Sequence, residues 1–169
     1  TAWEEAERTA ALLLAEAVGY LPLALELAAV RVSRGVPWTE LQQALEQEIA
    51  RLDVLEGSAR KRRTGGNTLE ASFNLSLNAL RQDDETAWEA FIWLGVLPED
   101  VQIAAPMAAT LWDVTETEAT DILEFLWNDA LLLPAPKILI GEKEWPAYRL
   151  HDLLHDLSCK LLTTDQPQG

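Results

Sequence analysis

Cysteine and histidine are scarce in this sequence, which has one cysteine, Cys159, and two histidines in 169 residues. A single cysteine excludes a disulfide framework and a cysteine-based zinc site, and it fits a reducing cytoplasm, where we expect the protein to reside. Long apolar runs are also missing, since none approaches the roughly 18 to 20 residues that span a bilayer. No signal peptide opens the chain, so we expect no membrane association.

Basic residues are few as well. Thirteen Lys and Arg stand against 28 Asp and Glu, which gives a formal net charge of −15. A uniformly acidic surface repels phosphate backbones, so nucleic acid is not an expected partner. Four of the cations stand together at Arg60–Arg63, followed by the flexible stretch Thr64–Asn67. Such a run indicates a solvated linker, with an anion or partner contact as the alternative.

The chain also lacks the motifs of a self-sufficient enzyme. It has no Gly-x-x-x-x-Gly-Lys phosphate loop, and Gly65-Gly66 does not form one. No serine stands in a nucleophile elbow, and a neighbouring His and Asp do not by themselves specify a catalytic triad. We therefore expect that the chain is not an enzyme by itself.

Apolar residues are plentiful at 49%, enough to bury a core, and the first third of the chain predicts three helices. The first runs from about Trp3 to Val18 and ends at Gly19. The second begins with Pro22 at its first position and is apolar nearly all round, so we expect it to be buried on most sides. The third is expected to be capped by Thr39 with Gln42. Its core face is predicted from the helical spacing of Leu41, Ala44, Leu45, Ile49 and Leu52.

The remainder predicts four further helices, a β-hairpin and a last helix. Helical stripes appear at Leu69, Phe73, Leu77 and Leu80, then at Trp88, Phe91 and Ile92 up to Gly95 and Pro98. A short helix is expected over about 103–111. Thr115 and Glu118 form a capping box that opens a helix to about Asp129. Short apolar runs at 131–133, 137–140 and 145–150 then predict the hairpin, and a helix begins near Asp152.

Helices followed by a hairpin predict a winged-helix domain. The expected fold is therefore mainly α: a small helical bundle over residues 1–62, then a winged-helix domain with a short β-hairpin over 63–169. The boundary falls where the helical pattern breaks, between Gly57 and Asn67. A winged helix raises the possibility of DNA binding. The helix from Glu116 to Asp129, however, has five acidic residues and no Lys or Arg, which suits phosphate contacts badly.

Both histidines stand in one stretch, Tyr148–Leu157, where each precedes an aspartate. His151 and His155 are one helical turn apart and could face one metal ion, but zinc needs three or four protein ligands, and Asp or Glu would have to complete the set. We therefore expect no metal site. The interpretation that we favour is that Asp152 caps the last helix and favours its positive end, while the histidines pack at a domain seam.

Two motifs, taken together, resemble the NB-ARC family of signal-transduction (STAND) ATPases. The stretch Gly19–Leu25, Gly-Tyr-Leu-Pro-Leu-Ala-Leu, resembles the family's Gly-Leu-Pro-Leu motif, and Leu150-His151-Asp152 resembles its Met-His-Asp motif. The two stand in the family's order, about 130 residues apart. Between them, Thr68–Ser76 is similar to the usual entry into the family's winged helix. The resemblance covers essentially the whole chain.

The resemblance implies a helical ARC1 domain and a winged-helix ARC2 domain, without the P-loop domain that precedes them in the family. It implies ADP or ATP as cofactor only in the full-length protein. Pro22 would pack beside the adenine and ribose, with Leu21 and Leu23 shaping the pocket. His151 would reach the β-phosphate of ADP and lock the inactive state, with Asp152 orienting that histidine. Implied partners are the P-loop domain and a C-terminal repeat domain of WD40 or TPR type.

The sequence departs from the family pattern at two positions. Tyr20 precedes Leu-Pro-Leu where the family has Gly, and Leu150 replaces Met as an apolar anchor of similar volume. His155 lies outside the motif, and we expect it to be a helix-surface or seam residue. Two alternatives to a nucleotide-sensing switch stay open: a winged-helix DNA-binding regulator, and a scaffold or interaction domain without nucleotide contact.

Overall fold

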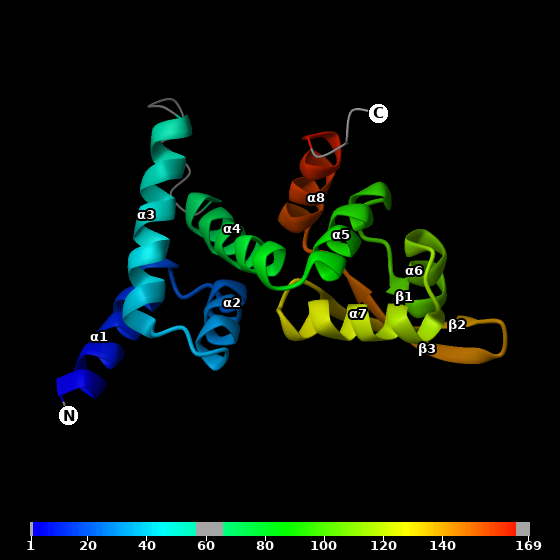
Figure 1. Ribbon diagram of the computed structural model, residues 1–169, viewed down its shortest axis with the longest axis horizontal. Helices are drawn as coiled ribbons and strands as arrows, with labels where there is room; N and C mark the ends of the chain where they lie inside the picture. Colours follow the sequence, from blue (N-terminus) through cyan, green and yellow to red (C-terminus); the bar gives the residue numbers. More distant parts are fainter. Residues whose placement is uncertain (1, 57–65, 165–169) are drawn as a thin grey trace. The chain divides into compact units, whose positions relative to one another are not determined.

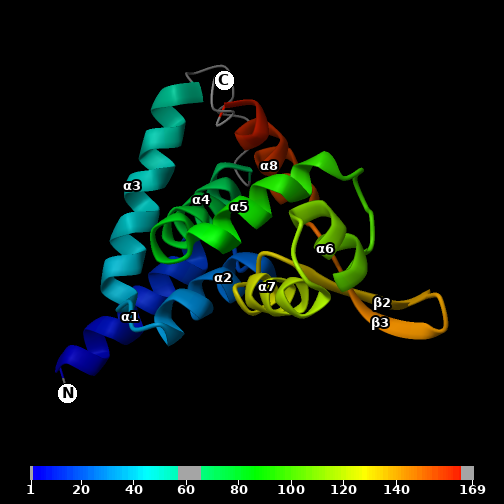
Figure 2. The ribbon, with the colours of Figure 1, turned by 45° about the vertical axis from the view of Figure 1, so that its right-hand side comes forward.

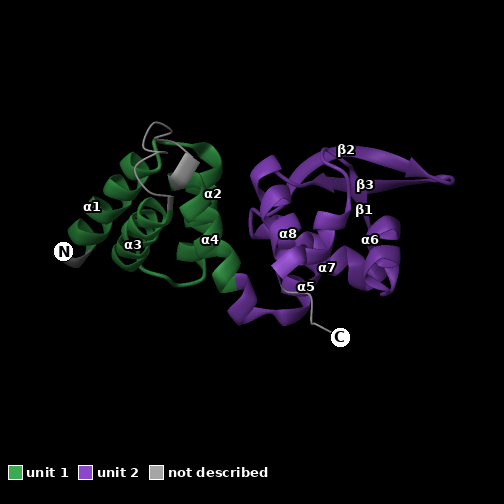
Figure 3. Cartoon of the chain, turned by 90° about the horizontal axis from the view of Figure 1, so that it is seen from above, with its two compact units in different colours: residues 1–79 green, residues 80–169 purple. Residues whose placement is uncertain are grey.

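The computed structural model describes residues 2–56 and 66–164. The chain divides into two compact units, residues 1–79 and 80–169, and each is described by itself (Figure 3). The expected boundary between residues 62 and 63 lies outside the described residues, as does the basic run Arg60–Arg63. The predicted fold class is confirmed, since the described residues form helices with one small three-stranded antiparallel sheet.

The first unit is a bundle of helices (Figure 1). Its elements are α1 (Ala2–Ala17), α2 (Pro22–Ser33), α3 (Trp38–Glu56) and the part of α4 (Gly66–Asp83) up to Ala79. The long α3 packs against both α1 and α2. The core cluster consists of Leu14, Val18, Ala24, Ala28, Leu41, Leu45, Leu52 and Ala71. The helical spacing predicted for α3 is confirmed, because Leu41, Leu45 and Leu52 are buried.

Two expectations for this unit were wrong. The helix α2 buries one face, with Ala24, Leu27 and Ala28, and leaves Pro22 and Ala29 exposed, so it is not buried on most sides. Its apolar composition is therefore not matched by burial within the described chain.

The second error concerns the start of α3. Thr39 was expected to cap this helix, but α3 begins one residue earlier, so Thr39 lies inside the first turn. The acceptor comes from α1 instead. The Glu7 carboxylate accepts hydrogen bonds from the Trp38 amide at 2.7 Å, from the Thr39 amide at 3.4 Å and from the Thr39 hydroxyl at 2.7 Å. Glu7, which is distant in sequence, thus caps α3 in place of the predicted pair Thr39 and Gln42.

The second unit has the element order of a winged helix. In chain order after α4 come α5 (Glu85–Trp93), η1 (Leu94–Val96), β1 (Ile103–Ala104), α6 (Ala105–Trp112), α7 (Glu116–Asn128), β2 (Leu133–Ile140), β3 (Lys143–Arg149) and α8 (Asp152–Thr164). The hairpin of β2 and β3 extends beyond α6 and α7 as the wing (Figure 2). The capping box of Thr115 and Glu118 is confirmed in both of its hydrogen bonds.

The sheet shows one element that the sequence did not predict. Its strand order is β1-β3-β2, and Ile103 and Ala104 pair with Tyr148 and Ala147 of β3. The helix expected from residue 103 therefore begins at Ala105. A strand of two residues is too short to show a periodic pattern in the sequence. It forms because Ile103 and Ala104 pair with β3.

Close packing joins η1 to α8. A Cβ added at Gly95 would lie 2.7 Å from the Cys159 amide nitrogen and 2.7 Å from the Ser158 carbonyl carbon. Real Cβ atoms do not approach backbone so closely, which makes glycine the residue that lets these two elements meet. Gly95 was expected only to stop the preceding helix.

Within residues 2–56 and 66–164, no helix is both long enough and apolar enough to cross a bilayer.

Candidate functional site

The Leu-Pro-Leu stretch follows a left-handed turn at the end of α1. Gly19 and Tyr20 have φ values of 60° and 55°. Their amides donate to the Glu16 and Ala15 carbonyls, at 2.9 Å in each case, which ends α1 as predicted. Glycine adopts this conformation without strain, whereas a residue with a Cβ rarely does. Tyr20, where the sequence departs from the family's glycine, therefore keeps the backbone conformation that glycine favours.

The start of α2 exposes apolar surface. Leu21 is the N-cap residue, with extended backbone and no side-chain capping bond, and Pro22 occupies the first helical position as predicted. Tyr20 is 64% exposed and Leu21 38%. Pro22 is also exposed, while Leu23 is half-buried. This edge thus offers an aromatic ring, a leucine and a proline to any group that covers it.

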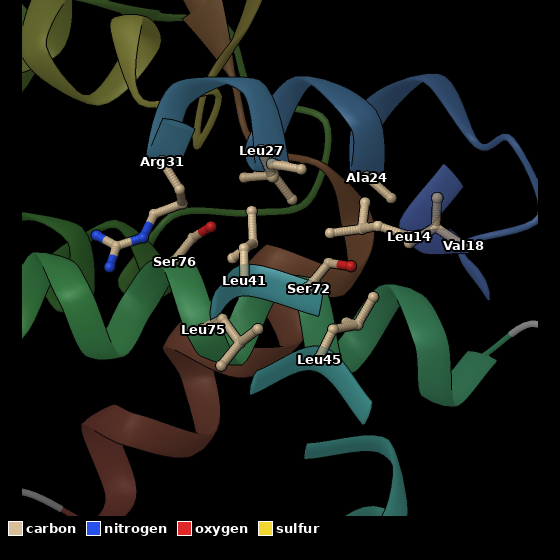
Figure 4. Close-up of a pocket in the computed structure, with 11 residues that line it drawn as sticks. Leu14, Val18, Ala24, Leu27, Arg31, Leu41, Leu45, Ser72, Leu75 and Ser76 are labelled. Atoms are coloured by element: carbon tan, nitrogen blue, oxygen red, sulfur yellow. The ribbon is translucent and has the colours of Figure 1, made fainter. Parts of the chain in front are cut away.

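A pocket beneath α2 belongs to the interior of the first unit (Figure 4). Its walls are mainly apolar side chains of α1, α2, α3 and α4, with Arg31, Ser72 and Ser76 as polar members. Leu21, Pro22 and Leu23 are not among its lining residues. The predicted nucleotide-contact residues therefore lie on the outer edge of α2 and not in this pocket.

The second part of the predicted site is the junction of β3 and α8. Leu150 is buried, at 7% exposed, so the apolar anchor expected at this position is present. His151 is half-buried and precedes α8, and its Nδ1 accepts a hydrogen bond from the Leu153 amide at 3.2 Å. His151 is thus the residue that caps α8. Asp152, expected to cap it, is instead the first residue of the helix, where its carboxylate favours the positive end.

This capping bond sets the tautomer of His151. Because an amide N–H can only donate, Nδ1 is unprotonated in this geometry and the neutral ring carries its proton on Nε2. The imidazole therefore has an N–H donor on the side opposite its own capping bond. A donor at the N-terminus of a helix, where the dipole is positive, suits a phosphate oxygen.

His155 has a different role from His151. Its Nε2 lies 2.7 Å from the Leu97 carbonyl oxygen, and the Cys159 thiol donates to the Gly95 carbonyl at 3.2 Å. Both bonds join α8 to η1 and to the residue that follows it. His155 was expected to be a helix-surface or seam residue; it is half-buried and packs on the Leu97 carbonyl within the second unit.

The helix α7, which occupies the position of the recognition helix in a winged-helix fold, exposes acidic side chains. Glu116, Glu118, Asp121 and Glu124 are exposed, while Asp129 is buried at the C-terminal cap. No Lys or Arg stands in the helix. Four carboxylates on this surface repel a phosphate backbone.

The two parts of the predicted site lie in different compact units, Leu21–Leu23 in the first and His151–Asp152 in the second. Residues that sequence reasoning missed are Glu7, as the cap of α3, and Glu99, which lies near His155. Neither belongs to a local motif, and only the fold brings them to their partners.

No family model matches the sequence. The chain is similar to the Regulatory protein AfsR of Streptomyces griseus, with 35% identity over 153 residues. It is similar to the Regulatory protein AfsR of Streptomyces coelicolor as well, with 34% identity over 152 residues. These matches cover 88% of the chain but only 14% and 13% of the two relatives. The chain thus spans about one seventh of the length of the curated relatives it matches.

Proposed function

We propose that this chain is the nucleotide-sensing part of a regulatory switch of NB-ARC type, which holds an ADP-bound inactive state. The cofactor is ADP or ATP, bound only when a P-loop domain elsewhere in a longer protein supplies the phosphate loop that this sequence lacks. The regulatory character is supported by the names of the two AfsR relatives. A C-terminal repeat domain of WD40 or TPR type is the further partner that the resemblance implies.

The observation that carries this proposal is the state of His151. Its Nδ1 accepts from the Leu153 amide, so the neutral ring carries its proton on Nε2, which is the tautomer that donation to a phosphate oxygen requires. The ring is held at the start of α8, where the helix dipole favours the same anion. A histidine with only a packing role would need neither this tautomer nor a position at the N-terminus of a helix.

The apolar edge of α2 supplies the complementary part. Pro22 and Leu21 are exposed, and apolar side chains of this kind suit the face of an adenine ring. Leu23 is half-buried and is the third residue expected to shape the nucleotide pocket. Asp152 supports the histidine through its place in the first turn of α8.

The switch follows from differential binding. ADP that contacts His151 in one arrangement of the domains only will favour that arrangement by the free energy of the contact. Exchange for ATP then changes the equilibrium and releases the inactive state. The acidic surface of α7 disfavours the alternative of a DNA-binding regulator, since phosphate contacts there would be repulsive.

The test is ADP retention in the full-length protein. Losing one hydrogen bond to a charged phosphate costs about 1.5–3 kcal/mol, so His151→Ala is expected to release ADP about tenfold to a hundredfold faster. Basal activity of the full-length protein should rise with it. The measurement is dissociation of a fluorescent ADP analogue after mixing with excess ATP.

The matched variant is His151→Asn. Asparagine is a favoured N-cap residue, so its oxygen keeps the cap of α8, while its shorter side chain withdraws the donor from the place of the imidazole Nε2. It should release ADP as quickly as His151→Ala while retaining the stability of the parent. Retention of ADP by His151→Asn would contradict the phosphate contact. If the parent with its P-loop domain binds no ADP, the chain is a scaffold without nucleotide contact.

A further inference from the structure

In the second unit, the side chains of Glu99, His155 and Asp156 converge. One potential ligand atom from each lies within 4.8 Å of those of the other two. Glu99 comes from the segment between η1 and β1, whereas His155 and Asp156 stand on α8. We propose that these three side chains bind a divalent transition-metal ion of the zinc class. This inference is independent of the proposed nucleotide switch.

The spacing is close to what a bound ion needs. Zinc binds imidazole nitrogen and carboxylate oxygen at about 2.0–2.2 Å, so ligands of one tetrahedral ion lie roughly 3.3 Å apart. The three groups must therefore approach by about 1.5 Å at most. Glu99 and Asp156 are both exposed, so their carboxylates can close this distance by changing rotamer without disturbing the core.

His155 makes the backbone hydrogen bond that metal-binding histidines commonly make with the ring nitrogen that is not a ligand. A carbonyl oxygen can only accept, so the 2.7 Å contact of Nε2 with the Leu97 oxygen is an N–H donor bond. The neutral ring then keeps its lone pair on Nδ1. Histidines that bind metals usually donate their other ring N–H to a backbone carbonyl or a carboxylate, which fixes the ring and raises its basicity.

The donor set indicates which ions fit. One imidazole with two carboxylates suits zinc, and manganese less well, whereas magnesium prefers oxygen ligands and retains its waters. The Cys159 sulfur lies 3.9 Å from the His155 ring nitrogens but donates to the Gly95 carbonyl, and it is not a member of the group. The net charge of −15 favours cations at any such site.

Binding would join α8 to the segment that leads into β1. An ion that binds only the folded protein divides the unfolding equilibrium constant by one plus the ratio of its free concentration to its dissociation constant. At a free zinc concentration one hundred times the dissociation constant, the unfolding equilibrium constant should fall about a hundredfold. The fold itself does not depend on the ion, because the core of the unit is apolar.

The experiment uses the 169-residue chain without a histidine tag. Zinc chloride is titrated by calorimetry, and the imidazole signals are followed by ¹⁵N NMR, in which the two histidines are readily separated. We expect one saturable site, a shift of the His155 signal on zinc addition, and no saturable response to magnesium. Glu99→Gln and Asp156→Asn should each weaken binding at least about tenfold.

Glu142→Gln, an exposed carboxylate on the turn of the wing, is the matched control and should bind zinc like the parent. Both Glu99 and Asp156 are exposed, so their variants are expected to fold, and a thermal melt without zinc checks this. Unchanged affinity in Glu99→Gln and Asp156→Asn would overturn the proposal. So would a zinc-dependent shift confined to His151, or the absence of a saturable site.

Discussion

At the scale of single residues, the turn between α1 and α2 stores backbone strain at Tyr20. A left-handed backbone costs a residue with a Cβ about 1–2 kcal/mol relative to its right-handed alternative. Gly19, with a similar φ, adopts the same conformation freely. Tyr20 is 64% exposed, so little packing of its ring offsets the strain within the described chain. Tyr20 thus adopts the left-handed backbone conformation that favours glycine, although it carries a side chain.

Replacing Tyr20 should therefore stabilise the isolated chain. Tyr20→Gly relieves the strain, but the greater freedom of glycine in the unfolded state costs about 0.5–1 kcal/mol. The free energy of unfolding is therefore expected to rise by a net amount of about 0.5–1 kcal/mol. Gly19→Ala should have the opposite sign and destabilise by about 1 kcal/mol. The free energy of unfolding in urea measures both. Stabilisation by Gly19→Ala, or a loss in Tyr20→Gly, would contradict the strained turn.

Individual residue roles were predicted only in part. Pro22 at the first helical position and Gly19 at the end of α1 follow from local chemistry, and both are confirmed. Glu7 could not be found that way, because its partners Trp38 and Thr39 reach it only through the fold. The contacts of Leu21–Leu23, His151 and Asp152 with a nucleotide stay predictions.

At the scale of elements, the packing of η1 on α8 depends on the absence of one side chain. A methyl group at Gly95 would meet backbone atoms of Ser158 and Cys159, which cannot move aside as a flexible side chain could. Gly95→Ala is therefore expected to destabilise the second unit by about 1–3 kcal/mol. Thermal unfolding followed by tryptophan fluorescence measures the loss.

Val96→Ala is the control for Gly95→Ala. Val96 lies next in the same element and is 55% exposed, so its truncation should change stability by less than about 0.5 kcal/mol. Equal losses in the two variants would show that η1 is sensitive to any change, and not to the close approach at Gly95.

The cap that α1 gives to α3 makes the first unit sensitive to acid. The hydrogen bond from the Thr39 hydroxyl lowers the pKa of Glu7 below its ordinary value of 4.5, helped by the Trp38 and Thr39 amides and opposed by burial. The folded-state pKa is therefore the lower one. The stabilisation is fully present above pH 4.5 and is lost as the pH falls through the folded value.

Glu7→Gln tests this dependence. The amide retains one acceptor oxygen but has no charge, so the variant should be less stable than the parent at pH 7, and the difference should shrink as the pH is lowered through the pKa of Glu7. Glu5→Gln, on an exposed position of α1, is expected to change little. Melting temperatures from pH 7 to pH 3 measure the difference. A difference that is constant with pH would contradict the capping role of the carboxylate.

Elements with strong periodicity were predicted well, and elements set by their partners were not. The stripes of α3 and α4, the capping box of α7 and the hairpin all appear in the structure. The strand β1 was taken as the start of α6, because Ile103 and Ala104 form a strand only by pairing with β3. The exposed face of α2 was missed because apolar composition does not show which side is covered.

At the scale of the whole chain, α4 belongs to both compact units. Its residues up to Ala79 lie in the first, where Ala71 is part of the core cluster and Leu69 and Leu75 pack against it, and its remainder lies in the second. The break in sequence pattern around residues 57–67 therefore comes before the last helix of the first core.

Truncation tests this organisation. Residues 1–83 include the whole of α4 and are expected to unfold cooperatively in urea, followed by circular dichroism at 222 nm. Residues 1–62 lack Ala71 and its neighbours, so an exposed core face should make that fragment unfold at lower urea or without cooperativity. Equal midpoints for the two fragments would show that α4 is not needed by the first unit.

The position of α4 also limits how this region can be recombined in evolution. An exchange of gene segments at the pattern break would carry α4 away with the winged helix and leave the first unit with the α4 of another lineage. The inner face of that helix, with Leu69, Ala71 and Leu75, would have to fit α1, α2 and α3 of the new host. We therefore expect α4 to be inherited with the helices that precede it, and viable chimaeras to join beyond its end.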